Sequence, residues 1–255
     1  MPQLELVTIP CLSDNYAFLL VDAESRSAAL IDAPEAAPIL AELSRRGLRL
    51  ADIWLTHHHA DHTGAVGELA TSDTRVVGAE ADAQRLPPLD LAVRDGETFE
   101  FAGAEVHVMD ASGHTMGHIA FYVPSVSAAF TADSLMAMGC GRLFEGDAPT
   151  MWATLSRLAA LPPETLVCSG HEYTAANARF AETIDSANPA LHTRIAEITA
   201  ARAEGRPTVP SLLAEEIATN PFLRARAAEV KANLGMASAS DTDTFAEIRK
   251  RKDAF

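Results

Sequence analysis

The segment Thr56–His62 concentrates side chains that bind metal ions. It reads Thr-His-His-His-Ala-Asp-His, so four of the nine histidines of the chain fall within six residues, beside one carboxylate. Neutral imidazole and carboxylate are good ligands for zinc, iron and manganese. A polar surface loop or a purification tag could contain a similar run, but a tag would be terminal and would not follow a β-rich apolar segment such as Ile53–Leu55. The segment therefore predicts a metal site at the end of a strand.

The spacing inside this segment predicts two groups of ligands. Alternate side chains of an extended chain share a face, so His57 and His59 point to one side while His58 points away. Beyond residue 60 the chain has to turn, which lets Asp61 and His62 face a second point in space. One short segment can therefore supply ligands to two sites.

Three further positions combine a strand end with a metal-binding side chain. His114 and His171 each follow a glycine shortly after a predicted strand, and Asp133 follows the predicted strand Ala128–Thr131. A lone histidine in such a place more often bonds a backbone carbonyl than a metal, so each position alone is weak evidence. Their repetition, together with Thr56–His62, at four strand ends predicts one metal centre.

The other histidines outside this set are expected to be structural. His107 lies inside a predicted strand and His192 inside a predicted helix. His118 follows His114 by four residues and is expected to support a ligand or to pack beside one. None of these three is expected to bind a metal ion directly.

The composition narrows the class of protein. With 255 residues the chain can form one large domain or two smaller ones with a sizeable core. Its mean hydropathy of +0.04 is ordinary for a soluble globular protein, and no apolar run reaches membrane-spanning length. The net charge of −15 argues against a nucleic-acid partner. Three cysteines without zinc-ribbon spacing, and an N-terminus without a signal peptide, predict reduced thiols in a cytoplasmic protein, which we expect to be a monomer.

The apolar pattern predicts an α/β part followed by a helical part. Strands are expected at residues 4–9, 16–21, 28–31, 53–55, 76–79, 99–101, 106–109, 121–123, 128–131 and 166–168. Helices are expected at residues 35–46, 81–86 and 151–160, the first capped by Asp32-Ala33-Pro34 and ended by Gly47. Beyond Tyr173 only helices are expected, within residues 174–203, 211–231 and 242–252. This change from strand-forming to helix-forming sequence places a domain boundary near residue 172 and gives domains 1–172 and 173–255.

The chain resembles the metallo-β-lactamase superfamily. The resemblance rests on Thr56–His62, Gly113-His114-Thr115, Asp133 and Gly170-His171. It implies an α/β fold, a four-layer αββα sandwich with a two-metal site at one edge. Later segments are similar to the glyoxalase II (hydroxyacylglutathione hydrolase) family in particular, namely Gly139–Gly146, Gly170–Thr174, Asn220–Arg224 and Arg249–Asp253. Because that family also has a small helical C-terminal domain, the resemblance covers the whole chain.

The resemblance implies a role for each candidate ligand. The first metal would be held by His57, His59 and His114. The second would be held by Asp61, His62 and His171. Asp133 would bridge the two, and Asp61 could also accept a hydrogen bond from the attacking nucleophile. The ligand types suit two divalent ions, with zinc favoured and iron or manganese as alternatives.

The same family implies residues that bind the glutathione part of a substrate. They would be Arg142, Phe144, Tyr173, Arg249 and Lys252. Two of these positions depart from the family pattern. Phe144 stands where the family often has tyrosine, which removes a hydroxyl, and Arg142 stands in place of lysine, which keeps the charge but changes the hydrogen-bond geometry.

The reaction that this implies is hydrolysis of a glutathione thioester. Seven protein ligands for two ions leave positions open for water and substrate, and metal coordination lowers the pKa of water to about 7, which supplies a hydroxide nucleophile. The products would be glutathione and a 2-hydroxy acid, D-lactate if the substrate is S-D-lactoylglutathione formed from methylglyoxal. No membrane partner is expected.

Three other readings compete with this one. A lactonase or β-lactamase of the same superfamily would use a similar site, but the segments after residue 138 favour the thioesterase. A mononuclear iron dioxygenase acting on glutathione persulfide would need one metal only, whereas a full second set of ligands is present. A binding domain with a vestigial site is disfavoured because no expected ligand is missing.

Overall fold

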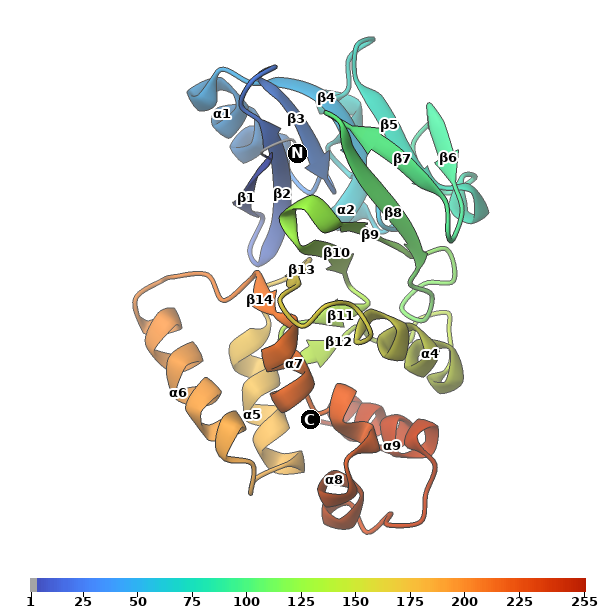
Figure 1. The fold of residues 1–255 in the computed structure, drawn as a ribbon, viewed down its shortest axis with the longest axis vertical. Helices are drawn as coiled ribbons and strands as arrows, with labels where there is room; N and C mark the ends of the chain where they lie inside the picture. The colour runs from blue at the N-terminus through green and yellow to red at the C-terminus, as the bar shows by residue number, and fades with distance from the viewer. Residues whose placement is uncertain (1–3) are drawn as a thin grey trace. The chain divides into compact units, whose positions relative to one another are not determined.

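The computed structural model describes residues 4–255, which form two compact units. The first unit runs to Ala111 and resumes at Gly117–Ala132, and the second comprises Ser112–Met116 and Asp133–Phe255. In Figure 1 most of the first unit is coloured blue to green, and most of the second is coloured yellow to red. Residues 1–3 of the expected domain 1–172 lie outside the described residues. Within residues 4–255 no helix is both long and apolar enough to cross a lipid bilayer.

The first unit contains a six-stranded sheet in the order β1-β2-β3-β4-β5-β6. Its strands are β1 (Leu4–Cys11), β2 (Asn15–Asp22), β3 (Ser27–Ile31), β4 (Arg49–Trp54), β5 (Arg75–Ala79) and β6 (Leu91–Val93). The first three strands pair antiparallel and the last four pair parallel. Every residue of β3 is buried, as expected for a strand with both faces covered.

A second, antiparallel set of strands in this unit packs against the first sheet. It has the order β10-β9-β8-β7, with β7 (Thr98–Phe101), β8 (Ala104–Asp110), β9 (Ile119–Val123) and β10 (Ala128–Ala132). Trp54 at the end of β4 is fully buried between the two layers. Its ring lies 5.2 Å from that of Phe99 and 5.5 Å from that of Phe121. Aromatic burial of this kind contributes a large share of core stability.

Helix α1 (Ala36–Arg46) covers the other face of the first sheet. Its Ile39 and Leu43 join the core cluster that contains Ile53 of β4. The helix ends at Gly47, whose φ of 63° is the left-handed conformation that glycine adopts without strain. The predicted cap was wrong at its other end, because the N-cap is Glu35 without a side-chain hydrogen bond, and Asp32 is used elsewhere.

Shorter elements connect these layers. They are α2 (Ala60–Thr63), α3 (Val66–Leu69), and the 3₁₀ turns η1 (Glu80–Asp82) and η2 (Pro124–Val126). The helix expected at residues 81–86 was wrong, since only η1 forms there. A segment that stops before Pro87-Pro88 is too short to offset the cost of nucleating an α-helix.

The second unit combines short strand pairs with helices. Strands β11 (Leu135–Met136) and β12 (Gly139–Cys140) form a hairpin, and β13 (Leu166–Ser169) pairs antiparallel with β14 (Ser211–Leu212). Its helical elements are α4 (Ala148–Leu158), α5 (Thr174–Ile184), α6 (Pro189–Ala203), α7 (Leu213–Thr219), η3 (Leu223–Arg226), α8 (Ala228–Asn233) and α9 (Asp241–Asp253). The expectation of helices alone beyond Tyr173 was wrong for β14, because two residues are too few to show a strand period.

Candidate metal centre

Three histidines of the first unit meet where β4 ends. The ring of His57 lies 4.7 Å from that of His59 and 4.3 Å from that of His62. Helix α2 begins at Ala60, so the turn expected there places Asp61 and His62 on a helical first turn. His57 and His62 are fully buried. The segment therefore brings its ligand candidates together as its spacing predicts.

A buried carboxylate orients His62. Asp32 Oδ2 lies 2.8 Å from His62 Nδ1, and an ionised carboxylate can only accept. The Nδ1 atom therefore carries the proton, and Nε2 of the neutral ring keeps a lone pair suited to a metal ion.

The same carboxylate orients His57 through a threonine. Thr56 donates its amide to Asp32 Oδ1 at 2.9 Å and its hydroxyl to Asp32 Oδ2 at 2.8 Å. Since the hydroxyl proton is used there, Thr56 Oγ1 can accept from His57 Nδ1, which lies 3.0 Å away. Nε2 of His57 is again the nitrogen with the lone pair. Asp32, which the sequence assigned to a helix cap, thus fixes the orientation and tautomer of two imidazoles. The signal that could have found it is an aspartate directly after a strand, as at Asp133.

Other side chains of the first unit hold the same loop. Asn15 donates its amide to Asp61 Oδ2 and to the Asp61 carbonyl, both at 3.1 Å. His58 turns toward the buried Asp82 at 2.8 Å, consistent with its expected outward direction. His118 stacks on His57 with ring centroids 4.6 Å apart, which fits the expected packing role.

The second unit gathers the remaining three candidates around one carboxylate. Asp133 Oδ2 lies 3.4 Å from His114 Nε2, and Asp133 Oδ1 lies 3.4 Å from His171 Nε2. All three residues are buried. Each oxygen therefore faces a different imidazole. His114 Nδ1 lies 2.8 Å from the carbonyl oxygen of Arg142, so Nδ1 donates and Nε2 again keeps its lone pair.

Two glycines make this arrangement possible. A Cβ atom on Gly141 would lie 2.0 Å from the carbonyl oxygen of Asp133 and 2.8 Å from His114 Nδ1. Gly113, directly before His114, has a φ of 141°, and a Cβ there would lie 2.9 Å from Met151. Both positions therefore require a residue without a side chain.

Two exposed aromatic rings border the histidines of the second unit. Phe144 is 64% exposed, and its ring lies 5.2 Å from that of His114. Tyr173 is 39% exposed and stacks on His171 with ring centroids 4.6 Å apart. Exposed rings beside candidate ligands offer apolar contact surface to a bound molecule.

The two basic candidates on α9 differ in environment. Arg249 is buried, donates to the Cys140 carbonyl at 3.0 Å and pairs with Asp253 at 2.8 Å. Lys252 is half-buried, with Nζ 5.1 Å from the Phe180 ring. Arg249 is thus tied into the fold, whereas Lys252 keeps part of its surface in solvent.

Lys252 lies in a group of positive charges. Burial lowers its pKa to about 8, with further lowering from the charges of Arg249, Arg179 and Arg142. Arg142 and Arg179 are exposed. Arg179 was not predicted from the sequence, because a single arginine on an amphipathic helix carries no signal of its own. Such a group of cations suits an anionic ligand.

The donor set fits divalent metal ions. Clusters of histidine and aspartate of this kind could hold a metal ion. His57, His62 and His114 each present Nε2 in the neutral form that a metal binds, because an acceptor or a hydroxyl fixes Nδ1. Imidazole with carboxylate is the ligand combination that zinc, iron and manganese accept.

Fold and donor set together define a class of protein. The family described as metallo-beta-lactamase superfamily matches residues 15–171, and the α/β fold with a helical C-terminal part is thereby confirmed. The family described as hydroxyacylglutathione hydrolase C-terminus matches residues 172–255. The chain therefore belongs to the hydroxyacylglutathione hydrolase family within that superfamily, also called glyoxalase II.

Curated relatives agree with this assignment over the full length. The chain is 62% identical to the hydroxyacylglutathione hydrolase of Ruegeria pomeroyi over 253 residues, which cover 99% of both chains. It is also 62% identical to the hydroxyacylglutathione hydrolase of Roseobacter denitrificans, with the same coverage.

Solved structures share the fold. ETHE1 from Myxococcus xanthus superposes with a TM-score of 0.69 at 26% identity, covering 97% of this chain and 90% of that one. TTHA1623 in a di-iron-bound form superposes with a TM-score of 0.55 at 33% identity, covering 66% of this chain and 91% of that one.

Proposed function

We propose that this chain hydrolyses the thioester bond of S-(2-hydroxyacyl)glutathione, with S-D-lactoylglutathione as the substrate and glutathione and D-lactate as products. This is the second step of methylglyoxal detoxification. The observation that carries the proposal is 62% identity over 99% of the chain to hydroxyacylglutathione hydrolases. The match of residues 172–255 to that family's own C-terminus separates the chain from lactonases, β-lactamases and dioxygenases.

We further propose two divalent ions per chain, with zinc favoured. The first would be held by His57, His59 and His114, and the second by Asp61, His62 and His171, with Asp133 shared. Support comes from the orientation of the imidazoles by their Nδ1 partners and from the position of Asp133 between two of them. The di-iron form of the relative TTHA1623 is a precedent for two ions. Bound divalent ions lower the pKa of coordinated water and polarise a carbonyl oxygen, which is the chemistry that thioester hydrolysis needs.

The residues of the chain itself would orient the reaction. Asp61 is held by Asn15, and its side chain is 41% exposed, so it can accept a hydrogen bond from a water that approaches the thioester carbonyl. In the hydrolysis, the oxygen of that water bonds to the acyl carbon, the C–S bond breaks, and the proton of the water ends on the thiol or in solvent. The leaving thiolate needs little assistance because the pKa of a free thiol is about 8.5.

Substrate binding would fall to residues of the second unit that differ in exposure. Arg142 and Lys252 would attract the carboxylates of the glutathione part, and Phe144 and Tyr173 would pack against its backbone. Arg249 would contribute by supporting this surface as well as by charge. On this view residues 1–172 form the catalytic domain and residues 173–255 the helical substrate-binding domain.

The expected cellular setting remains a proposal as well. Cys11, Cys140 and Cys168 are free and buried, which suits a reducing cytoplasm. A monomeric state remains a prediction that size-exclusion chromatography with light scattering can check.

The decisive experiment measures thiol release from S-D-lactoylglutathione by metal-replete protein, with elemental analysis of the same sample. We expect stoichiometric thiol and D-lactate, and two metal equivalents per chain. Parallel assays use a β-lactam, a lactone and glutathione persulfide with an oxygen electrode. Oxygen consumption with one iron per chain, or hydrolysis of the lactone or lactam without thioesterase activity, would overturn the proposal.

A further inference from the structure

The hairpin β11–β12 links two of the candidate ligands of the second unit. Asp133 lies two residues before Leu135, where the hairpin begins. Arg142 lies two residues after Cys140, where it ends, and its carbonyl oxygen holds His114 Nδ1 at 2.8 Å. A displacement of this hairpin would therefore move the Asp133 carboxylate and rotate the His114 ring together.

The turn of the hairpin is bound by side chains from α7 and its C-cap. Asn220 donates its Nδ2 protons to the carbonyl oxygens of Met136 at 3.1 Å and Gly139 at 3.0 Å. Glu216 Oε2 accepts the Met138 amide at 2.9 Å. Met138 has a φ of 60°, which is unfavourable for a side-chain-bearing residue unless its surroundings enforce it. These bonds join a tight turn to residues about 80 positions later in the chain.

Two other helices complete the same support. Asn177 of α5 donates to the carbonyl oxygen of Ala137 at 3.1 Å, and Arg249 of α9 donates to that of Cys140 at 3.0 Å. The backbone of the hairpin thus receives hydrogen bonds from three helical segments of residues 173–255. Few short hairpins can hold one geometry alone, because two strands of two residues contribute little pairing energy.

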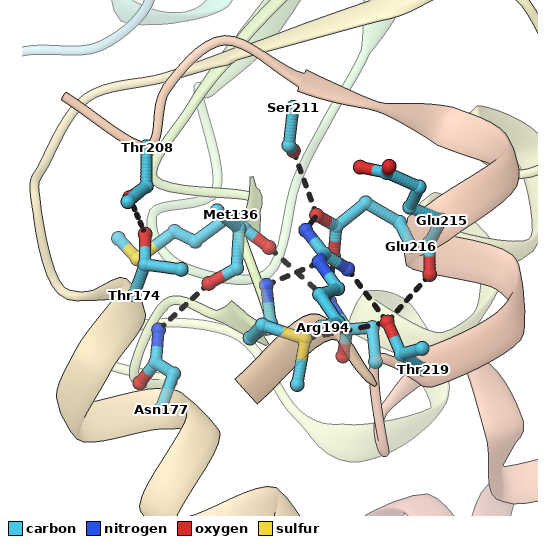
Figure 2. Close-up of polar contacts among 12 residues, drawn as sticks. Met136, Thr174, Asn177, Arg194, Thr208, Ser211, Glu215, Glu216 and Thr219 are labelled. Carbon is cyan, nitrogen blue, oxygen red and sulfur yellow. Dashed lines mark hydrogen bonds and ion pairs between the residues drawn. The ribbon is translucent and has the colours of Figure 1, made fainter. Parts of the chain in front are cut away.

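The carboxylate at the centre of this support is itself fully bonded. Glu216 is completely buried, and Figure 2 shows it among Arg194, Ser211 and Thr219. Glu216 Oε1 accepts from the Arg194 guanidinium and, at 2.7 Å, from the Ser211 hydroxyl. Its Oε2 accepts from the Met138 amide and lies 3.0 Å from Asn220 Nδ2, whose two protons are shared among three acceptors. These donors therefore fix the position of the carboxylate.

A buried ion pair of this kind has little value for stability alone. Well-packed apolar residues of similar volume are often as stabilising or more so, because they avoid the cost of desolvating two charges. Apolar residues could not accept the hydrogen bond from the Met138 amide. They also could not orient Asn220, which bonds the carbonyl oxygens of Met136 and Gly139. The network therefore points to control of geometry rather than to stability.

We propose that Glu216 and Asn220 are positioning residues, which act through the hairpin to set Asp133 and His114 for metal binding and thioester hydrolysis. The effect on thioester hydrolysis rests on the proposed function. The effects of Glu216 and Asn220 on the hairpin and on metal binding do not depend on it. The helical C-terminal segment would then have a second task besides substrate binding, namely to complete the catalytic domain.

The test compares Glu216→Gln with a matched control. The amide in Glu216→Gln has the same shape, but its NH₂ group would face donors, either Met138 and Asn220 or Arg194 and Ser211. The control is Asp185→Asn, the same change of a buried carboxylate in the same unit. Asp185 bonds Arg224 at 2.7 Å and Asn188 at 2.9 Å and makes none of the hydrogen bonds to the hairpin described above. A second variant, Asn220→Ala, keeps the ion pair between Arg194 and Glu216 but removes the two carbonyl contacts, together with the bonds of Asn220 to Glu216 and to the Phe222 amide. It serves if Glu216→Gln does not fold.

Three measurements are made well below the melting temperature, on protein that circular dichroism shows to be folded. In Glu216→Gln we expect faster hydrogen exchange at the Met138 amide. We also expect the metal affinity, measured by chelator competition, to be lower by about tenfold or more, as for other residues that orient ligands. With S-D-lactoylglutathione we expect kcat lowered about tenfold to a hundredfold, as for misplaced catalytic groups, with a smaller change in KM. Asp185→Asn should lower the melting temperature. It should leave the exchange rate at Met138, the metal affinity and the kinetic constants at wild-type values.

The proposal would be overturned if Glu216→Gln had the same exchange rate, metal affinity and kcat as the wild type. It would also be overturned if Asp185→Asn changed these quantities as much as Glu216→Gln does. If the thioester is not a substrate of the wild type, the proposed function fails. The exchange and metal measurements still decide whether the hairpin is positioned in this way.

Discussion

His62 and Asp32, thirty residues apart in the chain, share a buried hydrogen bond of 2.8 Å between Nδ1 and Oδ2. The same carboxylate fixes Thr56, whose hydroxyl lies 3.0 Å from His57 Nδ1. One aspartate at the end of β3 therefore sets the tautomers of two candidate ligands at the end of β4. The parallel pairing of β3 and β4 brings the two strand ends side by side, which makes this relationship possible.

Asp32→Asn should weaken metal binding without removing a ligand. The amide can present a donor to His62 Nδ1 and no longer favours the tautomer with a lone pair on Nε2. We expect metal affinity to fall about tenfold to a hundredfold, as is typical when a ligand loses its supporting carboxylate. Chelator competition measures this, with the exposed Asp73→Asn as the control. Wild-type affinity in Asp32→Asn would show that the hydrogen bond does not orient the ligand.

Asp133→Ala and His171→Ala should differ in how much metal they lose. Asp133 faces both His114 and His171 at 3.4 Å, so its removal should reduce the metal content below one equivalent and abolish turnover. His171→Ala should reduce the content toward one equivalent. Elemental analysis after gel filtration distinguishes the two results. Full metal content and full turnover in Asp133→Ala would contradict a shared carboxylate.

KM for the glutathione thioester should rise as the pH passes about 8, because the lowered pKa of Lys252 is about 8. Below that pH the lysine is charged and attracts a carboxylate, and above it the charge is lost. The loss of one charge-assisted hydrogen bond, roughly 1.5–3 kcal/mol, corresponds to about a tenfold or greater rise in KM when solvent screens it only in part.

The matched control for this dependence is Lys252→Arg, which stays charged across the range and should flatten the rise. Lys252→Ala should show the high KM at every pH, with a smaller effect on kcat. A thioester without the glutamyl and glycyl carboxylates should not distinguish these proteins. An identical pH profile of KM in wild type and Lys252→Arg would remove Lys252 from the substrate site.

Phe144→Tyr tests the departure from the family pattern at this position. The side chain is exposed beside His114, so an added hydroxyl has room, and we expect it to bond a bound substrate. A new hydrogen bond of about 0.5–1.5 kcal/mol should lower KM roughly twofold to tenfold. Steady-state kinetics measure the change. A KM that does not fall would mean that the hydroxyl finds no partner here.

The cysteines should be dispensable for catalysis. Burial raises the pKa of Cys140 to about 11 and that of Cys168 further still, so neither is a thiolate near neutral pH. Cys168→Ala should keep wild-type kcat, apart from any loss of stability, and iodoacetamide at pH 7.5 should not inactivate the native enzyme. A trapped acyl-cysteine in a mass spectrum, or an inactive but folded Cys168→Ala, would contradict this.

Much of the candidate site could be predicted from local sequence. The seven ligand candidates are short-range features: strand, turn and a histidine or aspartate in the next few residues. The longer strands were predicted well because they carry an apolar period, as in β1, or are apolar after their first residue, as in β3. The helix expected at residues 81–86 did not form, and strands β6, β11, β12 and β14 were not expected. All of these segments are too short for a period to appear.

The sequence by itself determined the ligand types, their order at four strand ends and the change from an α/β part to a helical part, because these depend on near neighbours in the chain. Only the tertiary structure decided which polar groups fix those ligands. Asp32 reaches His62 because β3 pairs with β4, and Glu216 reaches Met138 because α7 packs against a hairpin 78 residues earlier. A hydrogen bond between distant segments does not change the periodic pattern of either segment. A single aspartate or glutamate is compatible with both a helix and a turn, so the local sequence does not show which partner it will bond.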